Sequence, residues 1–144
     1  MGDRANIKIP MKACNGEPAG NVFLYGHWSG EEMPQVLQNG LRAGRGRWDD
    51  DTYLARIIAR EMGMGESGET GFGIGSYPAD NEHPFLVVDV ERQIVRVECP
   101  QDDGEISKII RKYHSDDTVS GKKEWTFEEY VAIEDPKWVR PKDE

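Results

Sequence analysis

The sequence has few cysteines, few basic residues and no long apolar run, and each shortage excludes a class of protein. Its two cysteines, Cys14 and Cys99, are far apart and form no CxxC pair, so we expect reduced thiols and no cysteine zinc site. No run of about 18 apolar residues is present, and no membrane partner is expected. The N-terminal segment MGDRANIKIP lacks the apolar core of a signal peptide, which favours a cytoplasmic protein of the bacterial host.

Basic residues are outnumbered, with 18 Lys and Arg against 27 Asp and Glu and a formal net charge of −9. Such a chain repels the phosphates of nucleic acid, so a nucleic-acid partner is not expected. The phosphate loop, the GxSxG nucleophile elbow and the HExxH metal helix are also missing. The motifs therefore predict no catalytic residue, no cofactor and no metal, and a non-enzymatic role is favoured over an enzymatic one.

What is present fits a single domain over residues 1–144. Four Trp, five Tyr and four Phe supply enough large rings to anchor a core. We expect an α+β fold in which an antiparallel sheet of about five strands carries two or three helices packed on one face. The core is expected over about residues 5–133, with residues 134–144 as a loosely ordered tail.

Short apolar or alternating runs predict the strands. The runs 7–11 and 22–25 are separated by turn formers and predict a hairpin, and the runs 85–90 and 94–97 predict a second one. In the stretch 70–77, TGFGIGSY, apolar residues alternate with glycine at the period of a strand. Its bare face indicates that another group approaches the backbone closely.

Capping residues predict where the helices begin. Ser29-Gly30-Glu31-Glu32 matches a capping box, with Pro34 tolerated in the first turn of the helix that follows. One of the carboxylates 49–51 is expected to cap a second helix, and the spacing of isoleucines predicts a third over 105–114. The stretch 126–133 is either a strand by alternation or a short helix with its own capping box.

Four segments occur in a distinctive order: YGHWSGEE, GRGRWDDDTYLARII, ETGFGIG and DNEHPFLVVD. In this combination the chain resembles a family of small uncharacterised proteins of bacteria and their phages, for which no activity is assigned. The resemblance covers about residues 5–97. It implies a fold neighbourhood and a phage setting, but no mechanism.

The first candidate site is the corner formed by His27 and Trp28, directly after a predicted strand. One interpretation is that alternation buries one ring and leaves the other hydrogen-bonded at the strand end. The other is that His27 donates a hydrogen bond to an anion while Trp28 stacks on a base. His27 has no visible nucleophile as a partner, so the binding role is favoured over catalysis.

The second candidate site gathers arginines and rings in one stretch: Arg45, Arg47, Trp48, Tyr53 and Arg56. These residues could simply form a solvated helical face with surface ion pairs, which contribute little. Guanidinium groups beside aromatic rings also suit bidentate phosphate contacts and base stacking. The second interpretation predicts a phosphorylated or nucleotide ligand.

The third candidate site is the loop Asp80-Asn81-Glu82-His83. A turn built by Asx side chains explains most of it, while Asn81 and Glu82 are the residues expected to face a ligand. A metal interpretation would use Asp80, Glu82 and His83, with Asp89 as a further candidate, because carboxylates and imidazole suit magnesium, manganese or zinc. A nuclease of the PD-(D/E)xK kind is disfavoured, since no lysine follows at the required spacing.

Taken together, these sites predict a small phage or prophage ligand-binding protein that sequesters an anionic small molecule, such as a nucleotide signal of host defence. The prediction requires the three sites to converge on one concave surface. One alternative is an acidic inhibitor of a host protein, presenting the acid pairs 102–103, 116–117, 128–129 and 134–135 to a basic surface. Another is a small enzyme acting on a nucleotide, with His27 or Glu82 as acid or base. The glycine strand and exposed aromatics would also suit a homodimer.

Overall fold

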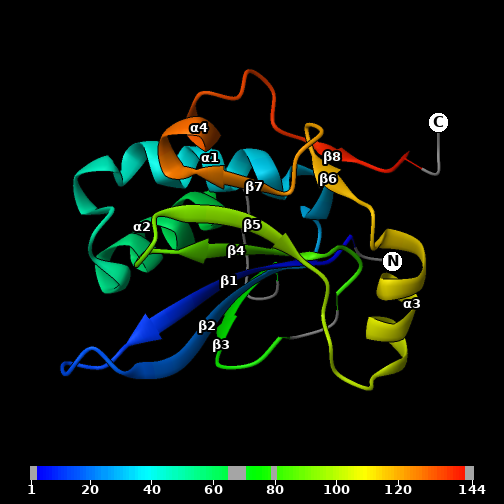
Figure 1. Ribbon diagram of the computed structural model, residues 1–144, viewed down its shortest axis with the longest axis horizontal. Coiled ribbons are helices and arrows are strands. Elements are labelled where there is room, and N and C mark those ends of the chain that lie inside the picture. The colour runs from blue at the N-terminus through cyan, green and yellow to red at the C-terminus, as the bar shows by residue number, and fades with distance from the viewer. Residues whose placement is uncertain (1–2, 65–70, 79–80, 142–144) are drawn as a thin grey trace.

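The computed structural model describes residues 3–64, 71–78 and 81–141 and shows an α+β fold (Figure 1). Its main sheet has six strands in the order β3-β2-β1-β4-β5-β7. The strands are β1 (Ala5–Lys12), β2 (Pro18–Gly26), β3 (Phe72–Gly75), β4 (Phe85–Asp89), β5 (Ile94–Glu98) and β7 (Glu124–Thr126). The predicted fold class is confirmed, with one strand more than expected.

The sheet is mostly antiparallel, but β1 and β4 pair in parallel. Parallel neighbours need a long connection, and here the chain forms the rest of the first hairpin, two helices and β3 before it returns beside β1. The alternation of apolar residues along one strand cannot predict that β4 pairs in parallel with β1. The apolar run at β4 was predicted to be central, and it lies between β1 and β5.

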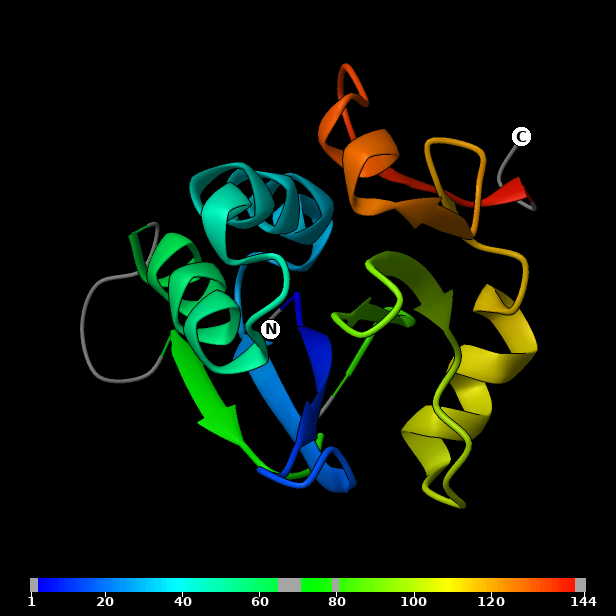
Figure 2. The same cartoon turned by 60° about the vertical axis from the view of Figure 1, so that its left-hand side comes forward.

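Four α-helices accompany the sheet: α1 (Met33–Ala43), α2 (Asp51–Met64), α3 (Glu105–His114) and α4 (Phe127–Val131). The 3₁₀ turns η1 (Gly30–Glu32) and η2 (Arg45–Arg47) precede α1 and α2, and β6 (Thr118–Val119) pairs with β8 (Trp138–Val139) in a small second sheet. Helices α1, α2 and α4 lie on the same side of the main sheet, while α3 stands apart at one end of it (Figures 1 and 2).

The main core lies between the sheet and the helices α1 and α2. Ile7, Leu24 and Leu86 occupy one row across three strands and are fully buried beneath the helices. The two helices pack closely because Gly40 has no side chain: a Cβ there would lie 2.9 Å from Cγ1 of Ile58 and 3.0 Å from its Cα. Glycine in mid-helix costs helix stability, and here it permits the close crossing.

The opposite face of the sheet has a smaller apolar cluster made by Phe23, Phe85 and Val87. Lys8 lies in the same row as Phe23 and Val87, and its Nζ contacts Oε1 of Glu98 at 2.9 Å. The aliphatic stem of the lysine therefore covers apolar surface while its charged end is paired.

Most of the predicted helix starts are confirmed. Pro34 lies in the first turn of α1, and Asp50 Oδ1 accepts a hydrogen bond from the Tyr53 N–H at 3.1 Å at the start of α2. The predicted third helix coincides with α3. Thr126 and Glu129 form the second capping box, so this stretch begins a helix.

The capping box predicted at Ser29 is wrong. The Ser29 side chain makes no cap hydrogen bond, and its hydroxyl is buried without a partner among the described residues. Asp3 takes the role instead, because its Oδ2 accepts the Glu31 N–H at 2.8 Å. A residue 28 positions earlier supplies the cap, which no local motif can reveal.

The loosely ordered tail predicted at 134–144 is also corrected for residues 134–141, while 142–144 lie outside the described residues. Trp138 is only 8% exposed and belongs to the main core. Its indole N–H donates to the Gly30 carbonyl at 2.9 Å, and β8 pairs with β6. The prolines and charged residues of this segment suggested a loose tail, but the buried Trp138 ring holds it against the core.

The bare face predicted for the glycine strand is not closely approached. A Cβ on Gly73 would meet its nearest neighbour, Cδ2 of Tyr25, only at 3.9 Å. β3 is an edge strand of the sheet, and Ile74 on it is exposed. In the described part of the chain, no helix is long and apolar enough to cross a membrane.

Candidate functional site

The structure distributes the nine predicted ligand-binding residues over three places. His27 and Trp28 lie at the end of β2, where they line a shallow hollow of about 230 Å³ with Tyr25, Phe72 and Gly73. The Tyr25 hydroxyl is hydrogen-bonded to Nδ1 of His27 at 2.6 Å, and Trp28 is 56% exposed. This corner is an aromatic surface, and none of the described residues that line it is a lysine or arginine.

The arginine group lies at the other end of α1. An 11-residue helix is about 16 Å long, so Arg45 and the His27 corner are separated by that length. Trp48 is buried and donates its indole N–H to the Leu41 carbonyl at 2.9 Å, which makes it a core residue. Arg45 lies over the Trp48 ring and pairs with Glu128.

The remaining members of this group also contact their own chain or solvent. The guanidinium of Arg47 lies 5.0 Å from the centroid of the Tyr53 ring, and both residues are exposed. Arg56 is exposed on the outer face of α2. The helical-face interpretation therefore describes the geometry of these residues, and the expected convergence with the His27 corner is not met.

The described members of the predicted loop site are likewise separated in the structure. Asp80 lies outside the described residues, and Asp89 pairs with Arg96 at 3.4 Å at the end of β4. Asn81 and Glu82 line a cavity at the opposite end of that strand, together with His83. Among the described members of the metal set considered from the sequence, Glu82 and His83 line this cavity and Asp89 does not.

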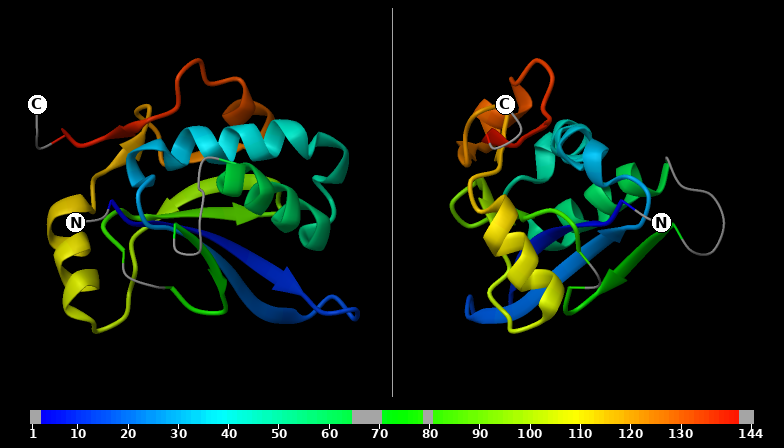
Figure 3. Two further views of the ribbon diagram at one scale, coloured as in Figure 1. Left: turned by 180° about the vertical axis from the view of Figure 1, so that it is seen from behind. Right: turned by 90° about the vertical axis from the view of Figure 1, so that its right-hand side faces the viewer.

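The cavity has a volume of about 520 Å³ and is formed by segments that are distant in sequence. The start of the chain, α3 and β8 lie at the same end of the sheet (Figures 1 and 3). Its lining comes from the N-terminal segment, η1, the segment before β4, α3 and the residue after β8: Asp3, Glu31, Asn81, Glu82, His83, Ile106, Ile109, Ile110, His114 and Arg140. One wall is polar and charged, and the wall contributed by α3 is largely apolar.

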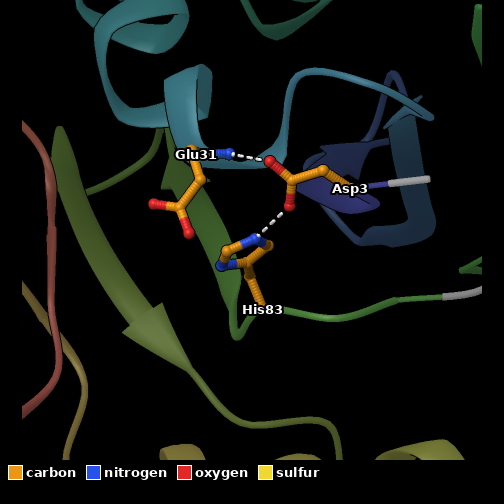
Figure 4. A group of neighbouring side chains, drawn as sticks. All are labelled: Asp3, Glu31 and His83. Atoms are coloured by element: carbon orange, nitrogen blue, oxygen red, sulfur yellow. Dashed lines mark hydrogen bonds and ion pairs between the residues drawn. The ribbon is translucent and has the colours of Figure 1, made fainter. Parts of the chain in front are cut away.

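Three ligand-type side chains converge on the polar wall (Figure 4). Nε2 of His83 lies 2.8 Å from Oδ1 of Asp3, and the other carboxylate oxygen of Asp3 accepts the Glu31 N–H. One ligand atom from each of Asp3, Glu31 and His83 lies within 4.8 Å of the other two. The three residues come from positions 3, 31 and 83, so the tertiary fold alone brings them together.

The backbone around Asp3 fixes this carboxylate firmly. The Asp3 N–H donates to the His27 carbonyl at 2.7 Å, and the Gly30 N–H donates to the Asp3 carbonyl at 2.8 Å. Gly30 leaves room for the pair: a Cβ there would lie 2.6 Å from Asp3 Oδ1 and 2.7 Å from Nε2 of His83. The glycine in the GEE sequence is therefore required by the site.

His83 is almost completely buried, at 1% exposure, and its ring stacks on Trp138 with centroids 5.3 Å apart. With Nε2–H donated to Asp3, the neutral ring leaves a lone pair on Nδ1, which has no hydrogen-bond partner among the described residues. A buried polar atom without a partner is costly and needs an explanation. Nε2 is the ring atom that faces Asp3, so an ion bound between these two side chains would replace the proton on Nε2, and the proton would then reside on Nδ1.

The spacing of the three side chains is close to that of a metal site. Bonds of about 2.1 Å in a tetrahedral site place the ligand atoms about 3.4 Å apart. The Asp3–His83 contact is already shorter than this, and the 4.8 Å limit on the Glu31 atom means that this atom needs to move by at most about 1.4 Å. Glu31 can make that movement because its side chain is 62% exposed.

A second histidine–carboxylate pair lies at the same cavity. Nδ1 of His114 lies 2.9 Å from Oδ2 of Asp117, whose side chain is buried. Arg140 lies near this pair and near Glu31 of the first group, since its Nη2 lies 3.6 Å from Glu31 Oε1 and its Nε lies 3.6 Å from Asp117 Oδ2. Both distances exceed the roughly 2.8 Å of a charge-assisted hydrogen bond, so the guanidinium can turn toward a ligand.

Sequence reasoning missed Asp3, Glu31, His114, Asp117 and Arg140. One signal was available: His114 and Asp117 are three residues apart at the end of a predicted helix, a spacing at which side chains meet. Asp3, Glu31 and Arg140 carried no comparable signal, because their partners are at least 23 positions away.

Asn81 is the predicted residue that is most clearly directed to this site. It is 5% exposed, it lines the cavity, and both polar atoms of its amide lack a partner in the part of the chain that the structure describes. An amide with a free donor and a free acceptor suits the polar edge of a ligand.

Comparison of the chain with protein-family models, with curated proteins and with solved structures gives no match. The site is therefore interpreted from its own geometry.

Proposed function

We propose that this protein binds a divalent cation through Asp3, Glu31 and His83 and, through that cation, a phosphate-bearing small molecule. The observation that carries the proposal is the convergence of one ligand atom from each of the three residues within 4.8 Å, where the ion would take the place of the proton shared by Asp3 Oδ1 and Nε2 of His83. Two carboxylates and one imidazole suit manganese or zinc better than calcium, which prefers oxygen ligands throughout.

The charge of the cavity explains why the cation must bind first. Among the described residues that line the cavity, three are carboxylates, Asp3, Glu31 and Glu82, against one guanidinium, that of Arg140. This surplus attracts a cation and repels an anion. A bound divalent ion offsets two of the negative charges, and the phosphate then completes the coordination of the ion while Arg140 contacts its oxygens.

The shape of the cavity favours a ligand with an apolar or aromatic part beside its phosphate. Its volume of about 520 Å³ falls in the range of small-molecule sites. Ile106 and Ile109 of α3 present exposed apolar surface along one wall, and Asn81 offers hydrogen bonds. A nucleotide has this combination of parts, so the nucleotide class predicted from the sequence is retained and its site is moved to this cavity.

A protein that binds the nucleotide without converting it would sequester a nucleotide signal. The phage setting of this role comes from the family resemblance. The competing acidic-inhibitor hypothesis is weakened by the positions of its carboxylates. Asp117 is buried, Asp102 accepts hydrogen bonds within the start of α3, and Glu129 closes a capping box. These groups are occupied by their own chain and are less suited to a basic host surface.

The first experiment measures cation binding by calorimetry and by the thermal midpoint, using ZnCl₂, MnCl₂, MgCl₂ and CaCl₂ on metal-free protein. We expect Zn²⁺ and Mn²⁺ to stabilise the protein by about 2.7 kcal/mol when the free ion is at 100 times Kd. Glu31→Gln should weaken this binding at least about 10-fold. The matched control Glu17→Gln removes the same charge in the β1–β2 turn, about 25 Å away along β1, and should bind as the wild type does.

The second experiment adds inorganic phosphate and 5′-nucleoside monophosphates with and without the ion. A further rise of the midpoint only in the presence of Zn²⁺ or Mn²⁺ supports the proposal. An unchanged midpoint with every cation, or equal cation binding by Glu31→Gln and the wild type, would overturn it.

A further inference from the structure

The pair formed by His114 and Asp117 has the geometry of a proton donor at the proposed phosphate site. Asp117 holds Nδ1 of the imidazole at 2.9 Å and is itself buried, so the ring orientation is fixed. The turn between them is closed by the Asp117 N–H, which donates to the His114 carbonyl at 3.0 Å. The imidazole lines the same cavity as His83.

Arg140 links the two groups that contain the histidines through a carboxylate of each. One guanidinium lies 3.6 Å from a carboxylate oxygen of each group, Glu31 on the cation side and Asp117 on the His114 side. A phosphate held by the cation and Arg140 therefore lies between the ion and the imidazole. This is the arrangement required when one group delivers a nucleophile and the other protonates a leaving group.

A purely structural role for the pair must be weighed beside this one. A basic side chain in the last turn of a helix is stabilising there, and His114 ends α3. That role would place the imidazole at the helix end but does not explain why it lines the cavity that also holds the metal ligands and Arg140.

We propose that the cavity hydrolyses a phosphate monoester whose leaving group packs against the isoleucines of α3. This inference rests on the proposed cation site. A water bound to the ion releases a proton to solvent, and the resulting hydroxide attacks phosphorus. The bond between phosphorus and the ester oxygen breaks, and protonated His114 donates its Nε2 proton to that oxygen. Asp117 stabilises the imidazolium, which regains a proton from solvent, so one water is added across the P–O bond overall.

The test compares two substrates that differ in their need for a proton. A nucleoside 5′-monophosphate has a poor leaving group, whereas p-nitrophenyl phosphate has a stable phenolate leaving group. With Mn²⁺ or Zn²⁺ bound, we expect His114→Gln to lower turnover of the nucleotide about 100-fold or more and that of p-nitrophenyl phosphate less than about 10-fold. Lys108→Gln on an exposed face of the same helix is the control and should leave both rates unchanged.

Each outcome decides between the proposals. Equal loss on both substrates would show that His114 acts structurally and would overturn its role as the acid. Intact recovery of the nucleotide, with cation and nucleotide both bound, would overturn hydrolysis and leave the binding proposal standing. Absence of cation binding would overturn both. Because His114→Gln leaves the buried Asp117 without its partner, assays are run well below the thermal midpoint of every variant, and Asp117→Asn should show the same leaving-group dependence.

Discussion

Replacing Gly30 by alanine tests the construction of the site most directly. The added Cβ would lie 2.6 Å from Asp3 Oδ1, 2.7 Å from Nε2 of His83 and 2.8 Å from the Asp3 carbonyl oxygen. The last of these is a backbone atom, and it already accepts the N–H of residue 30. No rotation of a side chain can relieve that contact, so the N-terminal segment must shift away from η1.

Overpacking of this kind costs about 1–3 kcal/mol of the free energy of unfolding. For a chain of this length, the thermal midpoint should fall by roughly 3–10 °C. The shift also separates Asp3 from His83, so Gly30→Ala should lose the cation-dependent rise of the midpoint together with its stability. Both quantities are measured in one thermal denaturation series with and without Zn²⁺.

The control for this prediction is Gly46→Ala in η2. A Cβ at Gly46 meets no atom within 4 Å among the described residues, so the free energy of unfolding should stay within about 0.5 kcal/mol of wild type. If Gly30→Ala keeps both the wild-type midpoint and its response to Zn²⁺, the close approach of residues 3 and 83 to η1 is refuted, and the site with it.

Three further predictions concern groups outside the site. Tyr130→Phe removes a buried hydroxyl that donates to the Pro34 carbonyl at 2.7 Å, and chemical denaturation should show a loss of about 1–2 kcal/mol. Burial raises the pKa of the Cys99 thiol, so peptide mass spectrometry after iodoacetamide treatment at pH 8 should find exposed Cys14 labelled well before Cys99. Hydrogen bonds from the capping box of α4 lower the pKa of Glu129. The ionised Glu129 therefore stabilises the fold at pH values above the ordinary pKa of a glutamate, and this stabilisation is lost as the pH falls through the lowered pKa. Glu129→Gln should flatten the acid side of the curve of unfolding free energy against pH.

The sequence by itself determined most of the helices and the two hairpins, because their signals are local. Alternation and turn formers predicted the hairpins, the isoleucine spacing predicted α3, and Thr126 with Glu129 gave a capping box as one of two alternatives for 126–133. These features depend on contacts within a few residues, where periodicity and capping operate. The α+β class follows from them.

The tertiary structure alone decided where the site lies. Asp3 caps η1 in place of Ser29, and the Trp138 indole N–H connects β8 to the Gly30 carbonyl. The His83 ring stacks on the Trp138 ring. The arginines and rings that cluster along the chain at 45–56 lie instead at the far end of α1. The physical reason is that a site needs side chains to converge in space, and the parallel return of β4 beside β1 sets that convergence without a local signal.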